Sequence, residues 1–226
     1  MEDRKLSRLG GAFSILLGIS YLVIGVTYFL QPTELQAGGD PAQFFSVFAQ
    51  DPLMHTVMNW AFALGAVLAL LVVPAIAETI HSEGEGWVRW ASNLAFVGFA
   101  VIAISYFRSI ALDPTMAADY IVGDASTKAA ILASSSLVSL DPQNWLGFGG
   151  VGLWILVVSL MALRIDEWPT TLSYVGIAGA ILYWLVVAGY VFSVPLLVAI
   201  SAGVGGVIVA PIWYIWVGLK LRGSST

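Results

Sequence analysis

Six long apolar segments, separated by short polar ones, dominate the pattern of residues along this chain of 226 residues. The clearest of them runs from Trp145 to Leu163 without a charged residue. As a helix these residues span about 28 Å at ~1.5 Å per residue, close to the ~30 Å hydrocarbon core of a bilayer. Asp141 precedes the segment as a helix cap, Pro142 suits the first helical turn, and Arg164 closes the far end. The segment therefore predicts a membrane-spanning helix.

Five further segments have a similar length and character, so the pattern predicts an all-α, polytopic membrane bundle of six transmembrane helices. The predicted spans cover residues 9–30, 52–77, 87–112, 142–164, 172–191 and 195–219. Because they leave no stretch long enough for a second folded unit, we expect residues 1–226 to form a single membrane domain. Pro211 is expected to kink the last span.

Two connections at the same end of the bundle are long enough to hold short helices. Asp40–Pro41 begins the first of these helices and Asp124 the second, so we expect a short interfacial helix in each connection. The longer connection covers residues 113–140 and is predicted to start a new helix at Asp113–Pro114. A structureless loop of that length is unusual, so it should fold over one mouth of the bundle.

Basic residues gather at one end of the predicted bundle. The end that holds both termini carries Arg4, Lys5, Arg8, Arg89, Arg164, Lys220 and Arg222. The positive-inside rule therefore places both termini in the cytoplasm, in a multi-pass protein of the cell membrane. Only Arg108 and Lys128 lie at the outer end, against seven acidic residues, so that this end carries the whole net charge of −5. A negative charge argues against a nucleic-acid partner and leaves the lipid bilayer as the expected one.

Small residues recur at helical spacing inside several spans. In the first span Gly11, Gly18 and Gly25 are seven positions apart, and small residues also crowd positions 199–206 of the last span. Such faces let helices approach closely. They predict packing seams, whether within this chain, against other membrane proteins or in a homo-oligomer.

Tryptophans are frequent near the predicted span ends, where an interfacial aromatic belt is expected. The belt would comprise Trp87, Trp90, Trp168, Trp213 and Trp216 on the inner side and Trp145 on the outer side. Trp154 and Trp184 fall near mid-membrane. There they either pack in the bundle or face lipid, or they line a cavity for a flat apolar ligand.

The chain offers few groups for chemistry inside a membrane. It has no cysteine, and no Asp, Glu or Lys falls inside a predicted span, which argues against thiolate metal sites and proton-coupled pumps. His55 and His81 lie at opposite ends of the bundle and cannot hold one haem between them. Motifs for phosphate binding, zinc hydrolysis or nucleophilic catalysis do not occur. We therefore predict no catalytic residue, no metal site and no resident cofactor, while a bound lipid or pigment is compatible with the sequence.

A group of polar and aromatic residues remains near the outer ends of the spans. The candidate ligand-binding residues are His55, Asn59, Tyr106, Arg108, Asn144 and Trp145. Arg108 lies about one turn inside its helix end, on the side where arginine is disfavoured. It either reaches the interface or pairs with Asp113 or Asp141, or else it contacts an anion or lipid headgroup in a pocket beneath the long connection. His55 and Asn59 form either a plain interfacial pair or a contact for a pigment metal or a polar head.

Two adjacent spans carry a pattern of their own: NWLGFGGVGLWILVVSLMALR, a short turn, and then WPTTLSYVGIAGAILYWL. A Gly-x-Trp core at Gly152 and Trp154 and a Leu-Arg end at Arg164 precede Trp168 and a glycine-rich helix. This pattern, at about residues 144–191, resembles an uncharacterised prokaryotic family of six-helix integral membrane proteins, a domain of unknown function. The resemblance implies the architecture, and it implies no activity.

Three functions follow from these observations. We favour a non-enzymatic membrane protein, a helical module that packs against partner membrane proteins or holds a lipid-like or apolar ligand at the outer leaflet. The first alternative is a transporter of a small or lipid-like solute, whose water-filled path would be lined by Asn59, Asn93, Ser105 and Arg108. The second is a membrane enzyme acting at the outer leaflet. It would need His55 and an outer aspartate within hydrogen-bonding reach in a cleft.

Overall fold

The computed structural model describes residues 2–36, 39–80, 85–135, 139–166 and 168–223, which are helical almost throughout. The long helices are α1 (Glu2–Leu30), α3 (Leu53–Ile80), α4 (Glu85–Val122), α6 (Val151–Ala162), α7 (Thr170–Val191) and α9 (Ala210–Gly223). The shorter elements are η1 (Thr33–Leu35), α2 (Pro41–Phe48), α5 (Ala125–Ser135), α8 (Pro195–Ala202) and the π-helical segments η3 (Trp145–Gly150) and η4 (Gly203–Val209). Six stretches of these residues are long and apolar enough to cross a membrane. The prediction of an all-α membrane protein with six spans is therefore confirmed.

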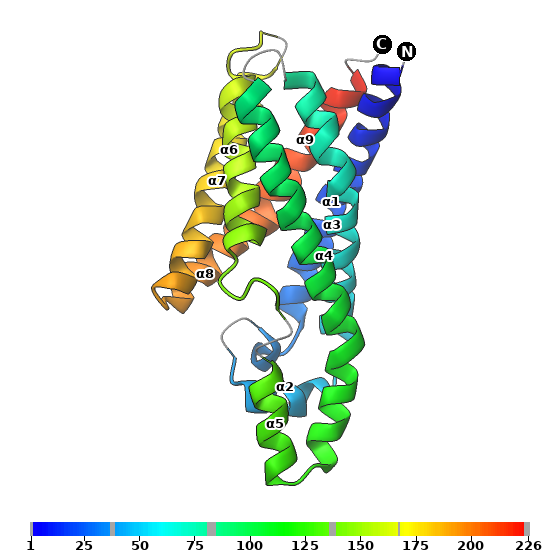
Figure 1. The fold of residues 1–226 in the computed structure, drawn as a ribbon, viewed down its shortest axis with the longest axis vertical. Coiled ribbons are helices and arrows are strands. Elements are labelled where there is room, and N and C mark those ends of the chain that lie inside the picture. The colour runs from blue at the N-terminus through cyan, green and yellow to red at the C-terminus, as the bar shows by residue number, and fades with distance from the viewer. Residues whose placement is uncertain (1, 37–38, 81–84, 136–138, 167, 224–226) are drawn as a thin grey trace.

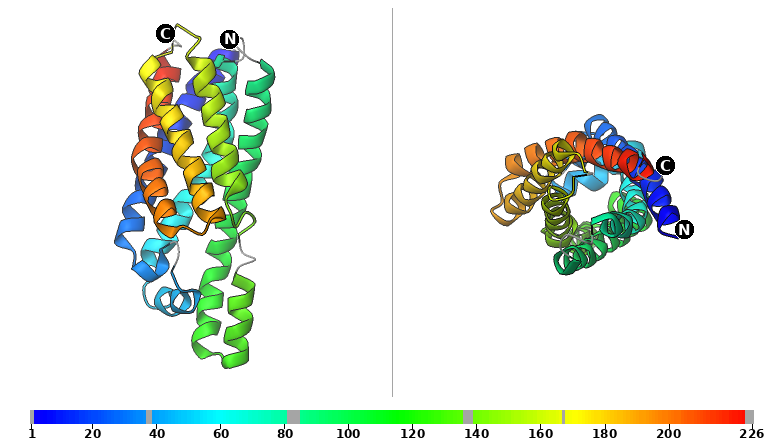
Figure 2. Two further views of the ribbon diagram at one scale, coloured as in Figure 1. Left: turned by 90° about the vertical axis from the view of Figure 1, so that its left-hand side faces the viewer. Right: turned by 90° about the horizontal axis from the view of Figure 1, so that it is seen from above.

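The six spans form a ring in chain order. Helix α1 packs against α3, α3 against α4, α4 against η3 and α6, and α6 against α7. The last span closes the ring, because α9 packs along α1 (Figures 1 and 2). Both termini lie at one end, the terminal end, and α2 and α5 lie at the opposite one, the cap end (Figure 1). Both termini lie at the same end because the number of spans is even.

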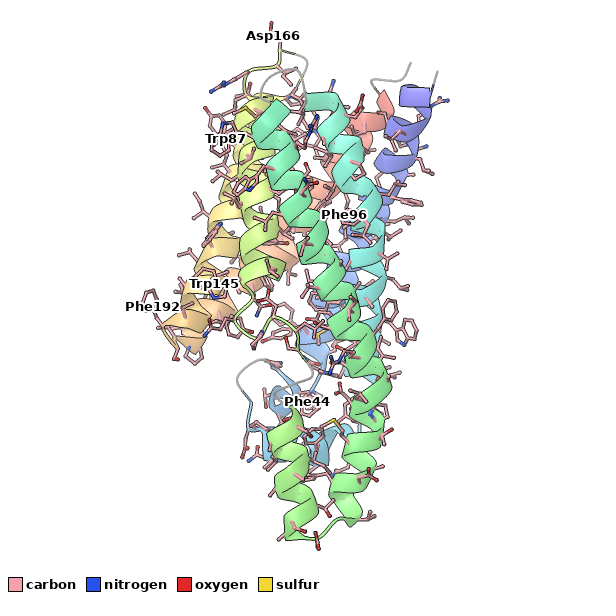
Figure 3. The ribbon with its side chains drawn as sticks, viewed as in Figure 1. Phe44, Trp87, Phe96, Trp145, Asp166 and Phe192 are labelled. Atoms are coloured by element: carbon pink, nitrogen blue, oxygen red, sulfur yellow. The ribbon has the colours of Figure 1, made fainter. Side chains whose placement is uncertain are left out.

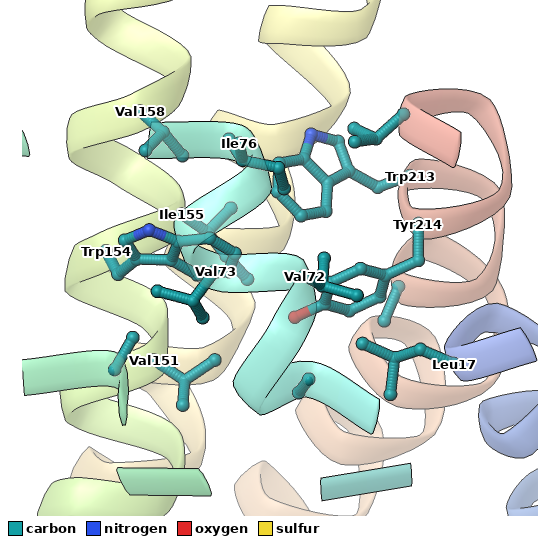
Figure 4. Packing of buried hydrophobic residues seen from close by; sticks show 14 of the residues in the cluster. Leu17, Val72, Val73, Ile76, Val151, Trp154, Ile155, Val158, Trp213 and Tyr214 are labelled. Carbon is teal, nitrogen blue, oxygen red and sulfur yellow. The ribbon is translucent and has the colours of Figure 1, made fainter. Parts of the chain in front are cut away.

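Aromatic side chains fill the middle of the ring. Trp154 is fully buried, and its ring meets Phe99 and Trp213 edge to face, with centroid distances of 6.3 and 5.9 Å (Figure 4). Tyr214, which is also fully buried, stacks on Tyr21 at 5.6 Å. Aliphatic side chains of α3 and α6 occupy the remaining space. The helices therefore enclose a packed core here.

The predicted aromatic belt exists only in part. Trp87, Trp90 and Trp145 are 67%, 49% and 48% exposed, as residues at a membrane interface should be. Trp168 and Trp213 are buried in the core, so their assignment to the belt is wrong. The reason is that a tryptophan at interfacial depth can point inwards as well as outwards.

The glycine seam of the first span faces the last span. A Cβ atom added to Gly11 would lie 2.8 Å from the carbonyl oxygen of Gly218, so the two backbones approach each other directly. Gly18 and Gly25 face α9 and η4 in the same way. Larger side chains at these positions would hold the two helices apart. The seam is thus used inside the chain, where it closes the ring.

Helix α4 continues well beyond the predicted end of the third span. The expected break at Asp113–Pro114 is wrong, because the helix runs on to Val122 with Pro114 inside it. At 38 residues and ~1.5 Å per residue it is about 57 Å long, far more than the ~30 Å core of a bilayer. A proline removes one hydrogen bond from a helix. Here α2 and α5 pack against this part of α4 and hold it in shape.

The short helices predicted in both long connections are present, and with the end of α4 they form a cap. The Asp40 carboxylate accepts a hydrogen bond from the Ala42 N–H and so starts α2. Hydrogen bonds from the Thr127 N–H and the Ser126 hydroxyl lower the pKa of Asp124, which precedes α5, to about 2. The cap has an apolar core of its own, formed by Leu35, Phe45, Phe48, Ala117, Tyr120 and Ile131.

Two spans contain π-helical segments. The fourth span begins at Trp145, later than predicted, because the chain first turns through Asn144 in the left-handed conformation with φ of 60°. Asp141 still caps this span, since its carboxylate accepts hydrogen bonds from the first three helical N–H groups. In the last span, η4 ends shortly before Pro211, which has no N–H to donate. A π-helical segment adjoins the proline where the sequence predicts only a kink.

Candidate ligand-binding site

A cavity of about 630 Å³ lies between the spans in the cap half of the ring. Its lining comes from every span and from the cap, and Phe44 of α2 marks its cap end (Figure 3). Lining residues recur three or four positions apart on each helix, as on α1 with Tyr21, Ile24, Tyr28 and Gln31. One face of each helix therefore points into the cavity.

The cavity is polar at one end and apolar at the other. Gln31, His55 and Asp113 lie towards the cap. Phe62 and Val101, several turns further along their helices, line the deep end. There the hydroxyl of Tyr21 accepts a hydrogen bond of 2.9 Å from the hydroxyl of Tyr183. The shape suits an amphiphile with its head near the cap and its apolar part in the membrane.

His55 is the centre of the polar end. Its Nδ1 lies 3.1 Å from Oε1 of Gln31, and because an amide oxygen can only accept, Nδ1 carries the proton in this contact. Phe44 and Phe48 meet the imidazole edge to face, with centroids 5.2 and 5.7 Å away. The ring is thereby held between α1 and α2, and its other nitrogen faces Asp113.

Asp113 is a buried acid with few partners. The residue is 7% exposed, and its Oδ2 lies 3.9 Å from Nε2 of His55. That distance is longer than the ~2.7–2.9 Å of a charge-assisted hydrogen bond. Among the residues that the structure describes, the carboxylate has no other charged or hydrogen-bonding neighbour, and no lysine or arginine lines the cavity. The carboxyl oxygens of Asp113 can therefore accept hydrogen bonds from a water or ligand in the cavity.

Asn59 follows His55 by one helical turn, and like Asp113 it is a buried polar residue with few partners. It is 3% exposed and lines the cavity, and its side chain makes no hydrogen bond to a described residue. Tyr106 on the neighbouring helix stacks flat on Phe62 at 4.2 Å and forms an aromatic wall beside it. Water or a ligand in the cavity is the available partner for the Asn59 amide.

Small residues of the last span create much of the space. Ala199, Ala202, Gly203 and Gly206 line the cavity, and a Cβ atom built on either glycine would have no neighbour within 4 Å. The sequence predicts a packing seam at this face. The prediction is confirmed at Gly205, where an added Cβ would lie 3.1 Å from Cβ of Leu182, and it is wrong at Gly203 and Gly206, which border open space.

Four of the six predicted ligand-binding residues line the cavity, namely His55, Asn59, Tyr106 and Asn144. Arg108 is half-buried on α4 and lies outside the lining. Trp145 also lies outside it: its ring packs against Trp184, and its Nε1 donates to Gln143. Of the two acids considered as partners of Arg108, Asp141 caps η3, and Asp113 faces His55 at 3.9 Å.

Asp113 is the cavity residue that the sequence reasoning missed. Its following proline suggested a helix start outside the span. A usable signal was present, because Ser105, Ser109 and Asp113 are each four positions apart and form one polar stripe on a helix. His81, the other histidine, lies outside the described residues.

A family model described as "Domain of unknown function (DUF4386)" matches residues 16–219, from the first span to the last. This agrees with the resemblance to an uncharacterised family. No curated protein and no solved structure matches the chain.

Proposed function

We propose that this chain, which belongs to the family defined by the domain of unknown function DUF4386, holds an amphiphilic small molecule or lipid in the cavity at its cap end. The observation that carries the proposal is a cavity of about 630 Å³ that holds two polar side chains, Asn59 and Asp113, with no hydrogen bond to a described residue. Ligand sites commonly measure ~300–1,000 Å³ and combine apolar walls with a few polar groups. A bound head group would complete the hydrogen bonds of Asn59 and Asp113.

Holding a ligand has more support than moving one across the membrane. A transport path was expected to include Asn59, Asn93, Ser105 and Arg108, of which Asn59 and Ser105 line the cavity. Asn93 is exposed on the outside of α4, and neither it nor Arg108 lines the cavity. Beyond the deep end lies the aromatic core around Trp154 and Tyr214. Packing against partner proteins also has less support, because the glycine seam of α1 is occupied by α9.

An enzyme of the outer leaflet is a second candidate, and one observation favours it. His55 and an aspartate do meet in a cavity, with Nε2 and Oδ2 3.9 Å apart. A proton-transferring pair acts at about 2.6–3.2 Å or through one water. The described residues contain no group of three metal-ligating side chains to assist it. The pair therefore supports binding more directly than catalysis.

Filling the cavity from its glycine wall tests the proposal. Gly206→Leu places a side chain into open space, so the fold should persist while the cavity shrinks. Native mass spectrometry of protein extracted into nanodiscs from its own membrane should show a bound species in the wild type and its loss in the variant. Gly86→Leu is the matched control, since Gly86 also borders open space but lies outside the cavity. Equal occupancy in all three proteins, or no bound species in the wild type, would refute the proposal.

We also propose that the terminal end faces the cytoplasm of a cell membrane and the cap faces outwards. The excess of basic residues at the terminal end supports this. Because the chain has no cysteine, single cysteines can report on it. In intact cells a membrane-impermeant maleimide should label Val122→Cys, at the 84% exposed end of α4, and should label Gly223→Cys only after lysis. The opposite labelling pattern would reverse the orientation.

A further inference from the structure

The charges around the cavity indicate which kind of head group it accepts. Its lining contains three acids, Glu34, Asp113 and Asp141, and among the described lining residues no lysine or arginine. Residues 37–38 and 136–138, next to the lining in the sequence, contain no basic residue. The carboxylate of Asp141 is already occupied, because it accepts three backbone hydrogen bonds. Asp113 has no such donors, so its carboxyl group keeps both oxygens for an ammonium group, whose positive charge would favour the ionised form of the acid.

The side chains of His55 and Asp113 are arranged so that a hydrogen-bond donor from a ligand could bind to both of them. With its proton on Nδ1, held by Gln31, the neutral imidazole presents the lone pair of Nε2 towards Oδ2 of Asp113. Two acceptors 3.9 Å apart do not bond to each other. A nitrogen that carries several hydrogens can bridge the two acceptors from the side, at about 2.8 Å from each and about 2 Å from the line that joins them.

Aromatic side chains contact His55 and are frequent elsewhere in the lining. Phe44 and Phe48 flank the imidazole, and Tyr28, Tyr106 and Tyr190 line the same cavity. The faces of aromatic rings attract cations, and they do so more strongly where water is excluded. The described lining is acidic and aromatic and has no lysine or arginine, which matches the chemistry of an organic cation.

The geometry points to an amphiphilic amine as the ligand, with its ammonium group between His55 and Asp113 and its apolar part directed towards Phe62 and Val101. This inference rests on the proposed function, and it names the ligand class for the same cavity. Along α4 the distance from Asp113 to Val101 is about 18 Å at ~1.5 Å per residue, room for an extended alkyl chain.

Such an ammonium group has two sources, an aminolipid of the bilayer or a free amine. An aminolipid brings a phosphate next to its ammonium. A phosphate buried near Asp113 and Glu34 would need a basic partner, which the described lining does not offer. The cavity therefore favours the free amine, and the experiment separates the two.

The test compares three probes with the same alkyl chain, dodecylamine, dodecyltrimethylammonium and dodecanol, titrated onto the protein in phosphatidylcholine nanodiscs. Dodecylamine should bind at least about 10-fold more tightly than the others, because it alone combines the charge with N–H donors. Asp113→Asn keeps the shape and removes the charge, so it should weaken dodecylamine by roughly 10- to 100-fold and leave dodecanol unchanged. Asp119→Asn, an exposed position on the same helix outside the cavity, is the matched control.

Each outcome decides the inference. If dodecanol or dodecyltrimethylammonium binds as tightly as dodecylamine, or if Asp113→Asn has no effect, the inference is wrong while the proposed function stands on its Gly206→Leu test. Should Asp113→Asn not fold, His55→Phe removes the other acceptor and must also abolish the preference for dodecylamine. Adding phosphatidylethanolamine to the nanodiscs displaces dodecylamine if the source is a lipid, and leaves it bound if the source is a free amine.

Discussion

Replacing Gly218 with valine is expected to prevent the ring of helices from closing. A Cβ atom there would lie 2.6 Å from the carbonyl oxygen of Gly11 and 2.7 Å from Cγ1 of Ile15. The first obstacle is backbone, so no side-chain rotation can relieve it, and α1 has to move away from α9. Overpacked cores lose about 1–3 kcal/mol, and occasionally more, when side chains can adjust. At this position we expect the upper end of that range or beyond.

The comparison with a second glycine of the same span makes this result interpretable. Gly203→Val introduces the same side chain into open space, so it should leave the thermal stability of the detergent-solubilised protein nearly unchanged. Gly218→Val should lower the midpoint of size-exclusion thermal melts by roughly 6–12 °C, from about 2–4 °C per kcal/mol for a chain of this size. Equal stability of the two variants would show that α1 and α9 do not approach as closely as described.

The glycines of the first and last spans also show what a sequence can and cannot reveal. Gly11, Gly18 and Gly25 of the first span and Gly203 and Gly206 of the last span form similar small-residue patterns. The first set packs against a helix, and the second borders a cavity. The difference lies in the side chains opposite each stripe, which come from other parts of the chain. A stripe of small residues in the sequence therefore does not tell whether another helix packs against it or a cavity borders it.

The number of spans was predictable because apolar length is a local property of the chain. The end of the third span was not. Asp113–Pro114 combines a capping side chain with a residue that lacks an N–H, which is typical of a helix start. Whether the preceding helix stops there depends on what packs around it. In this fold α2 and α5 pack against α4 beyond Pro114, and the helix continues to Val122.

The position of a residue along its span could be predicted from the sequence, but the side of the helix on which its side chain lies could not. Tyr106 and Arg108 lie at nearly the same depth, but at 3.6 residues per turn they point about 200° apart. Tyr106 lines the cavity, and Arg108 does not. Asn144 and Trp145 differ in the same way. In a soluble helix the polar side marks the direction, whereas here both lipid and the core are apolar.

Trp154→Ala is the second change with a large expected effect, a loss of about 3–5 kcal/mol of stability. Trp154 is fully buried and joins α6 to α4 and α9 through its contacts with Phe99 and Trp213. Removing the indole leaves a hole between three spans. The hole is lined by large, fixed side chains, so the surrounding helices cannot collapse into it.

Trp154→Phe should reduce stability far less, for a polar as well as a steric reason. Within the described residues, Nε1 of Trp154 is buried without a hydrogen-bond acceptor. Phenylalanine keeps an aromatic ring for both edge-to-face contacts and removes a donor whose burial costs about 1–3 kcal/mol. Thermal melts should rank wild type and Trp154→Phe close together and Trp154→Ala far below. Trp145→Ala, at a 48% exposed position, serves as the control with little effect. If Trp154→Phe is as damaging as Trp154→Ala, the indole N–H has a partner, and the core between α4, α6 and α9 contains a polar contact that packing alone does not explain.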